Sequence, residues 1–197
     1  MKALVVGGNG LLGSGLVRAL ALRGIQVESL DFPKDLFDLS EKTLIESKID
    51  LILNFAVKVD TSTPNIQLYS DDYRVNVLGT QHLLDLSKIT ATPLIHISTR
   101  EVIGVRDFRQ QKSGNSPLFL VNENENLAPK NSYGITKLIS EFLLKDYHLG
   151  SVIRLNTCYT DDWQQGKGLI GNLIKKSRQQ HEITLDNEGK AMRDPLH

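Results

Sequence analysis

The 197-residue chain has a single cysteine, Cys158, so it cannot form an internal disulfide, and we expect this residue to be a buried thiol. It carries 23 basic and 23 acidic side chains, and therefore has no positive excess to attract nucleic acid or an anionic membrane. No apolar run is long enough to span a bilayer. The chain opens on a strand-like segment without the pattern of a signal peptide. These features predict a cytoplasmic protein whose partners include neither nucleic acid nor membrane.

Apolar segments of two kinds alternate along the chain. Runs typical of buried strands lie at 3–6, 25–30, 50–57, 94–98 and 151–155, with a shorter one at 183–185. Segments with helical spacing lie near 16–22, 40–47, 70–88, 133–147 and 169–180. Regular alternation of strand and helix predicts an α/β fold, in which right-handed crossovers build a doubly wound parallel sheet.

A glycine-rich turn follows the first apolar run. Gly8, Gly10 and Gly13 match the pattern G-x-G-x-x-G between a strand and a helix, where glycines allow the backbone to approach a pyrophosphate. The pattern alone is weak, because a glycine turn can also exist without a ligand. Asp31 strengthens it, since it ends the second apolar run 18 residues after Gly13, where a carboxylate would bind the adenosine ribose. With no arginine just after Asp31, the sequence predicts NAD rather than NADP.

Tyr133 and Lys137 lie four residues apart, on one face of a predicted helix. A phenol beside an ammonium group is a device for proton transfer. Lowering a tyrosine pKa from ~10 to a working pH takes about 3 units, which the lysine and an oxidised nicotinamide could supply together. For an isolated pair, an exposed tyrosine and lysine on a solvated helix is the simpler interpretation. His96 lies within an apolar strand and is expected to be a packed core histidine rather than a ligand. We find no spacing typical of a metal site, and predict none.

Six motifs occur in one order. They are the turn with Gly7, Gly10 and Gly13, and the segments 54–56, 75–80, 96–104, 154–156 and 189–197. In this order they resemble the extended short-chain dehydrogenase/reductase superfamily, in its NAD-dependent epimerase/dehydratase branch that acts on nucleotide sugars. The resemblance covers essentially the whole chain. It implies a Rossmann sheet followed by only the start of a smaller substrate-binding domain.

The resemblance also implies roles for individual residues. The catalytic residues would be Thr99, Tyr133 and Lys137. The NAD-binding residues would be Gly7, Gly10, Leu11, Leu12, Asp31, Phe32, Asp35, Leu36, Phe55, Ala56, Val57, Asn76, Tyr133, Lys137 and Leu155. The substrate-binding residues would be Thr99, Glu101, Asn156 and Arg193. In this scheme Tyr133 takes a sugar hydroxyl proton, Thr99 hydrogen-bonds the same oxygen, and Lys137 holds the nicotinamide ribose and tunes Tyr133.

The expected organisation is an NAD-binding domain at 1–165 and the beginning of a nucleotide-sugar-binding region at 166–197. Members of the family usually continue for another hundred residues or more, so we expect this chain to be a fragment or to lack the substrate half. The leading hypothesis is an epimerase-like oxidoreductase with a nucleotide-sugar substrate. A reductase, a dehydratase and a non-catalytic dinucleotide-binding protein are the alternatives, and a homodimer is an open option. The short link from Asp31 to Asp35 resembles that of the dTDP-4-dehydrorhamnose reductases.

Arg100 bears on the dehydratase alternative. The segment 96–102 resembles that of the dTDP-glucose 4,6-dehydratases, which have an aspartate between the threonine and the glutamate. Here Arg100 stands in that place, between Thr99 and Glu101. A guanidinium stays protonated and cannot act as the acid that expels water. The sequence therefore predicts no dehydratase activity, unless Arg100 merely points away and forms a surface ion pair.

Overall fold

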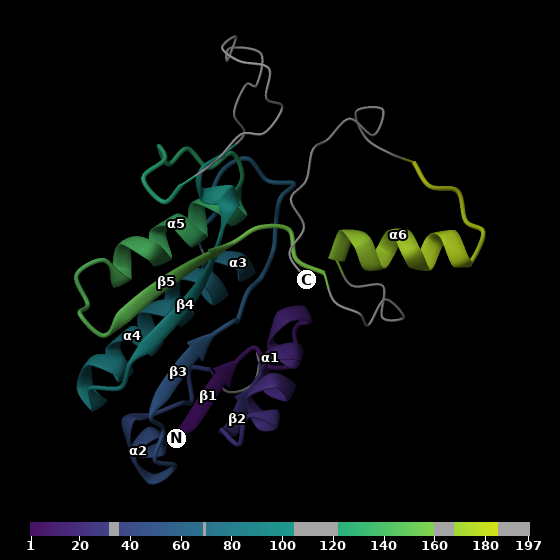
Figure 1. Ribbon diagram of the computed structural model, residues 1–197. Coiled ribbons are helices and arrows are strands. Elements are labelled where there is room, and N and C mark those ends of the chain that lie inside the picture. Colours follow the sequence, from purple (N-terminus) through teal and green to yellow (C-terminus); the bar gives the residue numbers. More distant parts are fainter. Residues whose placement is uncertain (32–35, 69, 105–121, 160–167, 185–197) are drawn as a thin grey trace.

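The computed structural model describes residues 1–31, 36–68, 70–104, 122–159 and 168–184. Within these ranges the chain forms a five-stranded parallel sheet with helices on both faces (Figure 1). The strands are β1 (Lys2–Val6), β2 (Gln26–Leu30), β3 (Leu51–Asn54), β4 (Leu94–Thr99) and β5 (Gly150–Leu155), and they lie in the order β2-β1-β3-β4-β5. The doubly wound parallel architecture predicted from the sequence is confirmed.

The helices follow the predicted segments closely. They are α1 (Leu11–Leu22), α2 (Glu41–Glu46), α3 (Asp71–Tyr73), the π-helix η1 (Arg74–Leu78), α4 (Gly79–Thr90), the 3-10 helix η2 (Arg100–Val102), α5 (Ser132–Leu144) and α6 (Gly168–Arg178). The segment predicted as one long helix at 70–88 is thus a helical run interrupted by a π-turn. The short strand expected at 183–185 differs, because residues 183 and 184 have no strand structure and 185 lies outside the described ranges. Three apolar residues are too few to specify a strand by themselves.

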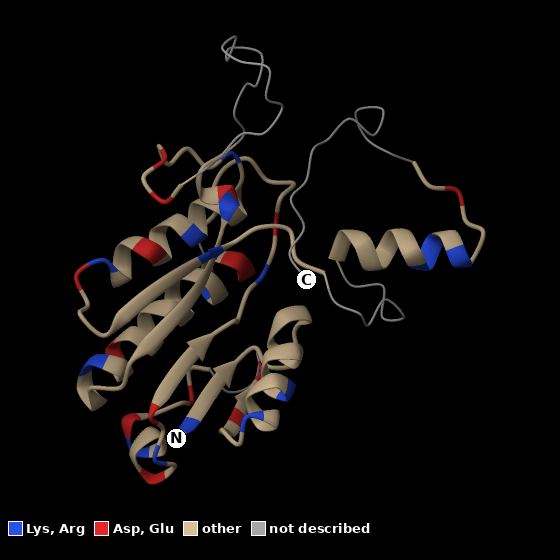
Figure 2. Ribbon diagram, in the orientation of Figure 1, with Lys and Arg blue, Asp and Glu red and all other residues tan. Residues whose placement is uncertain are grey.

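Each face of the sheet has its own core, because side chains alternate along a strand. Leu4 and Val6 of β1 point into a large cluster shared with α2, α4 and α5, whereas Ala3 and Val5 point into a smaller cluster shared with α1. Paired residues of neighbouring strands point to the same face of the sheet, as Leu4 of β1 and Ile52 of β3 do. The charged side chains are carried mainly by the helices and connecting segments around the sheet (Figure 2).

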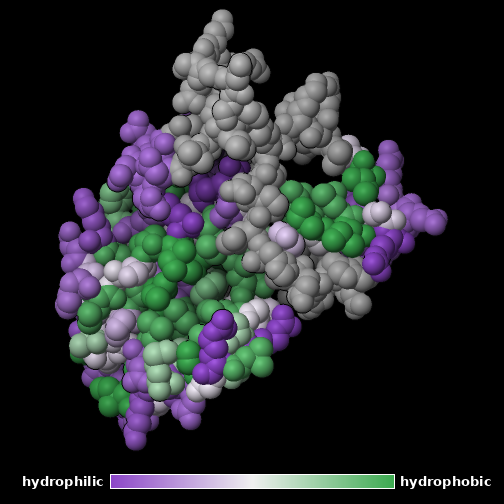
Figure 3. Space-filling model, viewed as in Figure 1, coloured by the Kyte–Doolittle hydropathy of each residue, from purple (hydrophilic) through white to green (hydrophobic). Residues whose placement is uncertain are grey.

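One part of the sheet is open. Ile153 on β5 pairs with Ile97 on β4, and alternation along β4 puts both on the side of α1. The side chain of Ile153 is 45% exposed. The space-filling view shows a broad apolar surface over this region (Figure 3).

Candidate functional site

The glycine turn brings α1 close to the carboxyl ends of β1 and β3. Gly7 has a positive φ of 86°, and a β-carbon on it would lie 2.7 Å from the backbone nitrogen of Ala56. A β-carbon on Gly13 would lie 2.1 Å from the carbonyl oxygen of Gly7. Gly10 is the N-cap of α1 and donates its N–H to the Gly7 oxygen at 3.1 Å. The first turn of α1, which holds Leu11 and Leu12, therefore directs its N–H groups to a corner where side chains are excluded and an anion fits.

Asp31 stands beside this corner. Its Oδ1 accepts the backbone N–H of Asn9 at 2.7 Å, and its Oδ2 accepts the Ser29 hydroxyl at 3.1 Å. The carboxylate is thereby fixed at the end of β2, next to the glycine turn. This is the place where an acceptor for ribose hydroxyls is needed.

The other residues expected near the adenosine are placed differently or lie elsewhere. Phe32 and Asp35 fall outside the described residues. The side chain of Leu36 is 1% exposed and belongs to the large core cluster, facing Gly79 at the start of α4. Because burial of an aliphatic side chain is favourable, Leu36 serves the core, and its side chain is not available to an adenine.

The end of β3 forms the floor beside the turn. The Phe55 N–H donates to the Val6 oxygen at 2.8 Å, which continues the pairing of β1 and β3 past their last paired residues. Ala56 is buried and Val57 is 45% exposed. Leu155, at the end of β5, is half-buried. These expected cofactor contacts all lie at the carboxyl edge of the sheet, as Gly7 does.

Thr99 and Tyr133 meet although 34 positions separate them. Thr99 ends β4, and Tyr133 is in the first turn of α5, whose N-cap Asn131 accepts the Gly134 N–H at 2.8 Å. A β-carbon on Gly134 would lie 2.8 Å from the Glu101 carbonyl oxygen, so the glycine allows α5 to approach η2. The Thr99 side chain comes near enough to the Tyr133 phenol to act on its pKa. The structure therefore brings together two of the residues expected to be catalytic.

The electrostatics of Tyr133 differ from the expectation. Burial raises the pKa of the phenol above its usual value of 10.0, the Thr99 hydrogen bond lowers it in part, and the Glu101 carboxylate raises it further. Lys137 is not among these influences. Lys137 lies on the same helical face as Tyr133, but its side chain turns into the interior. It therefore does not lower the Tyr133 pKa in this structure.

Lys137 is instead bonded to His96 in the interior. The Lys137 Nζ lies 3.1 Å from the His96 Nε2, and the His96 Nδ1 lies 3.1 Å from the Asn54 Nδ2. Lys137 is 2% exposed and His96 0%. Burial lowers the pKa of Lys137 to about 7, and burial followed by the neighbouring Lys137 lowers the pKa of His96 well below 6.5.

The sequence interpretation of His96 as a core histidine was right about burial but missed its partner. A usable signal was present. In β4 the alternation places His96 on the face of Leu94 and Ser98, which is the face covered by the helix that carries Lys137.

Asn76 ties three segments together behind Tyr133. Its side chain accepts the Lys58 N–H at 2.9 Å and donates to the Lys58 oxygen at 2.8 Å and to the Thr136 hydroxyl at 2.9 Å. The Ser140 hydroxyl donates to the Asn76 backbone oxygen at 2.6 Å. Asn76 lies within η1 and is 0% exposed, so its side chain fixes the segment after β3 against α5.

The first turn of α5 is also held from outside. The Ser132 N–H donates to the Thr63 oxygen at 2.7 Å, and the Tyr133 N–H donates to the Asp60 oxygen at 3.0 Å. The Asp60 carboxylate in turn accepts the hydroxyls of Thr63 and Ser62, and these bonds lower its pKa to about 2. The loop 60–63 therefore sets the position of Tyr133 through the backbone.

The predicted substrate residues lie around the same edge where they are described. The Arg100 Nε is 3.9 Å from the Glu101 Oε1, an ion pair between partly exposed side chains, which was the alternative to a role of Arg100 in the site. The Asn156 Oδ1 accepts the Thr157 N–H at 2.9 Å. Arg193 is outside the described residues. Cys158 is half-buried, and burial raises its pKa, which does not favour the thiolate.

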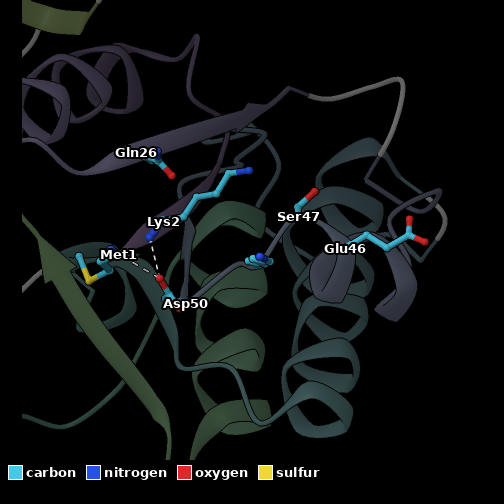
Figure 4. A pocket seen from close by; sticks show the side chains of 7 residues that line it. Met1, Lys2, Gln26, Glu46, Ser47 and Asp50 are labelled. Atoms are coloured by element: carbon cyan, nitrogen blue, oxygen red, sulfur yellow. Dashed lines mark hydrogen bonds and ion pairs between the residues drawn. The ribbon is translucent and has the colours of Figure 1, made fainter.

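A hollow at the opposite end of the sheet is not a competing site. Figure 4 shows it lined by residues of the amino ends of the strands, including Met1, Lys2 and Asp50. Ligands of open α/β sheets bind at the carboxyl ends of the strands instead. Across the residues that the structure describes, no cluster of three metal-binding side chains occurs, and none of the described helices is long and apolar enough to cross a membrane.

Comparison with known proteins agrees with this geometry. The model of the NAD dependent epimerase/dehydratase family matches residues 3–197, so the chain belongs to this family, whose members depend on NAD. The low-salt glycan biosynthesis protein Agl12 of Haloferax volcanii is 27% identical, over 98% of this chain and 68% of its own length. The dTDP-4-dehydrorhamnose reductase of Aggregatibacter actinomycetemcomitans is 30% identical, over 90% of this chain and 57% of its own length.

Among solved structures, the UDP-glucuronic acid 4-epimerase of Bacillus cereus, in complex with UDP-glucuronic acid and NAD, superposes with a TM-score of 0.81. It is 24% identical, and the match covers 99% of this chain and 68% of the epimerase. At this identity the likeness shows the fold alone. The chain thus spans between about half and two thirds of the relatives that it matches.

Proposed function

We propose that this chain carries the NAD-binding half and the proton-transfer residues of an oxidoreductase that acts on a nucleotide-activated sugar in the manner of an epimerase. The observation that carries the proposal is that the end of β4, with Thr99, and the first turn of α5, with Tyr133, come together at the carboxyl edge of the sheet that also holds the glycine turn. Family membership supports it, because the family contains NAD-dependent enzymes. We place the boundary of the NAD-binding part near residue 165.

The residues present fit the dinucleotide. A β-carbon at Gly7 or Gly13 would fill the corner beside α1, and Asp31 supplies a fixed acceptor next to it. Gly7, Gly10, Leu11 and Leu12 would hold the pyrophosphate through the backbone, and Asp31 would hold the adenosine ribose. When bound, NAD supplies the acceptor and donor of hydride that the reaction needs.

Tyr133 would take the proton from a sugar hydroxyl as the carbon that bears it is oxidised, and would return the proton on reduction. The Thr99 hydroxyl would donate a hydrogen bond to the same oxygen as it becomes a carbonyl oxygen. Gly134 supports this arrangement, because it allows α5, which carries Tyr133, to approach η2 directly after Thr99. The residue type of Arg100 argues against elimination of water, because the position expected to supply the acid holds a guanidinium that stays protonated.

A reductase is the second candidate, favoured by the 30% identity to the dTDP-4-dehydrorhamnose reductase. The two functions differ in redox balance. An epimerase returns its cofactor to the starting oxidation state, whereas a reductase consumes one reduced cofactor for each product.

The test is to add UDP- and dTDP-sugars to the protein loaded with NAD, and to follow nicotinamide reduction by absorbance and sugar inversion by NMR. We expect inversion without net cofactor consumption. Tyr133→Phe should keep NAD affinity and slow the reaction by roughly 10²–10⁴-fold, the usual share of a general acid–base group. Tyr147→Phe is the matched control, since that phenol hydrogen-bonds Ser87 and Thr92 in the core. Full activity of Tyr133→Phe, or net oxidation of reduced cofactor by a keto sugar, would refute the epimerase assignment.

A further inference from the structure

The buried chain Asn54–His96–Lys137 has a defined direction of hydrogen bonding. The Ala56 N–H can only donate, and it faces the Asn54 Oδ1 at 3.2 Å, which fixes the orientation of the Asn54 amide. The Asn54 Nδ2 then donates both of its hydrogens, one to the Thr80 hydroxyl oxygen at 3.1 Å and one to the His96 Nδ1 at 3.1 Å. The Thr80 hydroxyl is free to accept, because its own hydrogen goes to the Asn76 oxygen at 2.7 Å.

This direction determines the state of the next two groups. The His96 Nδ1 must be an acceptor, so the proton of the neutral imidazole is on Nε2. That Nε2–H points to the Lys137 Nζ at 3.1 Å. An ammonium group has only donors and cannot accept this hydrogen, whereas a neutral amine can.

We propose that His96, held by Asn54 in its Nε2–H form, stores Lys137 as a neutral amine inside the protein, and that charging of Lys137 releases it toward the cofactor edge. His96 is thus a positioning residue that acts through Lys137. In the stored state, Lys137 neither charges the site nor lowers the Tyr133 pKa.

The surroundings of Lys137 agree with a neutral stored amine. On β4 it faces His96, and on its own helix the Glu141 carboxylate acts to raise its pKa. That carboxylate is already engaged by Arg154 at 2.7 Å and by the Ser98 hydroxyl at 2.5 Å. Burial prevails over Glu141, and the net effect is a Lys137 pKa lowered to about 7.

The link to the cofactor rests on the proposed function. If Lys137 binds the nicotinamide ribose as an ammonium, then NAD binding above pH 7 must take up a proton. One linked proton weakens apparent binding by up to about tenfold for each pH unit above the Lys137 pKa. The storage itself does not depend on NAD and can be measured without it.

The first experiment measures the protein without cofactor. Lysine labelled with ¹³C at Cε is titrated by NMR, with Lys137→Met for assignment, and two-bond ¹H–¹⁵N spectra report the His96 tautomer, with His96→Phe for assignment. We expect a Lys137 midpoint near 7 and a proton on the His96 Nε2. A midpoint at the ordinary lysine value of about 10.4, or a proton on Nδ1, would overturn the proposal.

Asn54→Asp tests the direction of the hydrogen bonds from Asn54 through His96 to Lys137. A carboxylate cannot donate, so His96 must turn its proton to Nδ1 and offer Nε2 as an acceptor to an ammonium. The tautomer signal should switch, and the Lys137 midpoint should rise by about one pH unit or more. His82→Gln is the control, because His82 is hydrogen-bonded to the Leu39 oxygen and takes no part in the Asn54–His96–Lys137 hydrogen bonds. This variant should change neither the tautomer signal nor the Lys137 midpoint. An unswitched tautomer in Asn54→Asp contradicts the proposal, and if this variant does not fold, the wild-type measurements still decide.

The second experiment is calorimetry of NAD binding at pH 8 and pH 6 in buffers of different ionisation enthalpy. We expect uptake of close to one proton at pH 8 and almost none at pH 6, with the uptake lost in Lys137→Met. Binding without proton uptake at pH 8 would overturn the release of Lys137. Absence of NAD binding would instead contradict the proposed function. The NMR measurements would still test whether His96 holds Lys137 as a neutral amine.

Discussion

The carboxylate of Asp31 is the group that we expect to set which dinucleotide binds at the glycine turn. This carboxylate is held by the Asn9 N–H and the Ser29 hydroxyl, so it cannot readily turn away from a ligand at the glycine turn. A 2′-phosphate would meet this negative charge, whereas ribose hydroxyls would donate to it. We expect NAD to bind more tightly than NADP, and Asp31→Asn to reduce the preference by about tenfold or more, since hydrogen bonds to a charged acceptor are the stronger kind.

Calorimetric titration of both cofactors measures this preference. Asp50→Asn is the matched control, because Asp50 accepts the Lys2 N–H at the opposite end of the sheet and should leave the ratio unchanged. Tighter NADP binding by the wild-type chain would contradict the assignment of Asp31.

Lys137 predicts an unusual dependence of stability on pH. In the folded chain its pKa is lowered to about 7, whereas an unfolded chain has an ordinary lysine near 10.5. Between these values the unfolded state binds more protons, so the free energy of unfolding should rise with pH from 7 to about 10, by at most about 1.4 kcal/mol per pH unit from this group. Below pH 7 both states bind the proton, and the contribution is constant.

Urea unfolding at pH 7, 8 and 9 measures this slope. Lys137→Met should flatten it, whereas Lys42→Met should not, because Lys42 is an exposed partner of Glu46 on α2. Equal slopes in wild type and Lys137→Met would show that Lys137 is charged when buried.

The sequence did not predict that Lys137 meets His96 rather than Tyr133. Helical spacing correctly put Tyr133 and Lys137 on one face. The direction of the Lys137 side chain depends on His96, which lies 41 positions away and whose tautomer is set by Asn54 on yet another strand. Such an arrangement follows only from the packed fold, because no local pattern encodes a hydrogen-bond direction that passes through two strands and a helix.

At the next scale, α5 owes its starting point to a loop that is distant in the sequence. Loop 60–63 accepts the N–H groups of Ser132 and Tyr133, and the Asp60 carboxylate organises the loop. Asp60→Ala removes the carboxylate that accepts the hydrogen bonds of Ser62 and Thr63. We expect faster amide hydrogen exchange at Ser132 and Tyr133, by several-fold, while the middle of α5 stays protected.

Mass-spectrometric or NMR exchange at pH 4 and pH 7 measures this effect. Because hydrogen bonds from Thr63 and Ser62 lower the Asp60 pKa to about 2, the carboxylate stays ionised at both pH values and the wild-type protection should persist at pH 4. Asp85→Ala is the control, since Asp85 accepts a hydrogen bond from the Gln81 amide on the exposed face of α4, away from α5. Unchanged exchange at Ser132 in Asp60→Ala would assign the start of α5 to Asn131 alone.

The run from Asp71 to Thr90 shows where periodicity stops being informative. Apolar spacing predicted one helix, and the run is helical throughout, but residues 74–78 form the π-turn η1. Asn76 lies within this turn and bonds Lys58 and Thr136, and π-turns are often found at functional sites. Apolar spacing with a period of 3.6 residues cannot predict the extra residue in a π-helical turn, because that turn is stabilised by hydrogen bonds to residues distant in the sequence.

Across the whole molecule, the parallel type of the sheet follows from the alternation of apolar strand and helix segments, whereas the order β2-β1-β3-β4-β5 was not predicted. The five strands were predicted because each is a short, β-rich apolar run bounded by turn residues, and parallel pairing follows from the helices between them. The carboxyl edge then collects Gly7, Asp31 and Thr99 without any further information. What alternation does not predict is how completely each face is covered, because that depends on which helices reach it.

The open apolar face gives the last prediction. Ile153 is 45% exposed and pairs with the half-buried Ile97 on the α1 side of the sheet. Figure 3 shows broad apolar surface on the molecule in the same view as Figure 1. Contiguous apolar surface of this kind drives association, because burying it against a second surface removes it from water. We expect the 197-residue chain to self-associate with rising concentration, and Ile153→Lys to reduce the association measured by sedimentation velocity.

Leu22→Lys is the matched control, since Leu22 is 88% exposed on the last turn of α1 rather than on the β4–β5 part of the sheet. It should leave the association unchanged, because a single exposed leucine offers little area to a partner, whereas a charge at Ile153 must be desolvated when the face is covered. Equal association of wild type and Ile153→Lys would show that the contact lies elsewhere. If only Leu22→Lys reduced the association, the self-association interface would lie at the end of α1 rather than on the β4–β5 face.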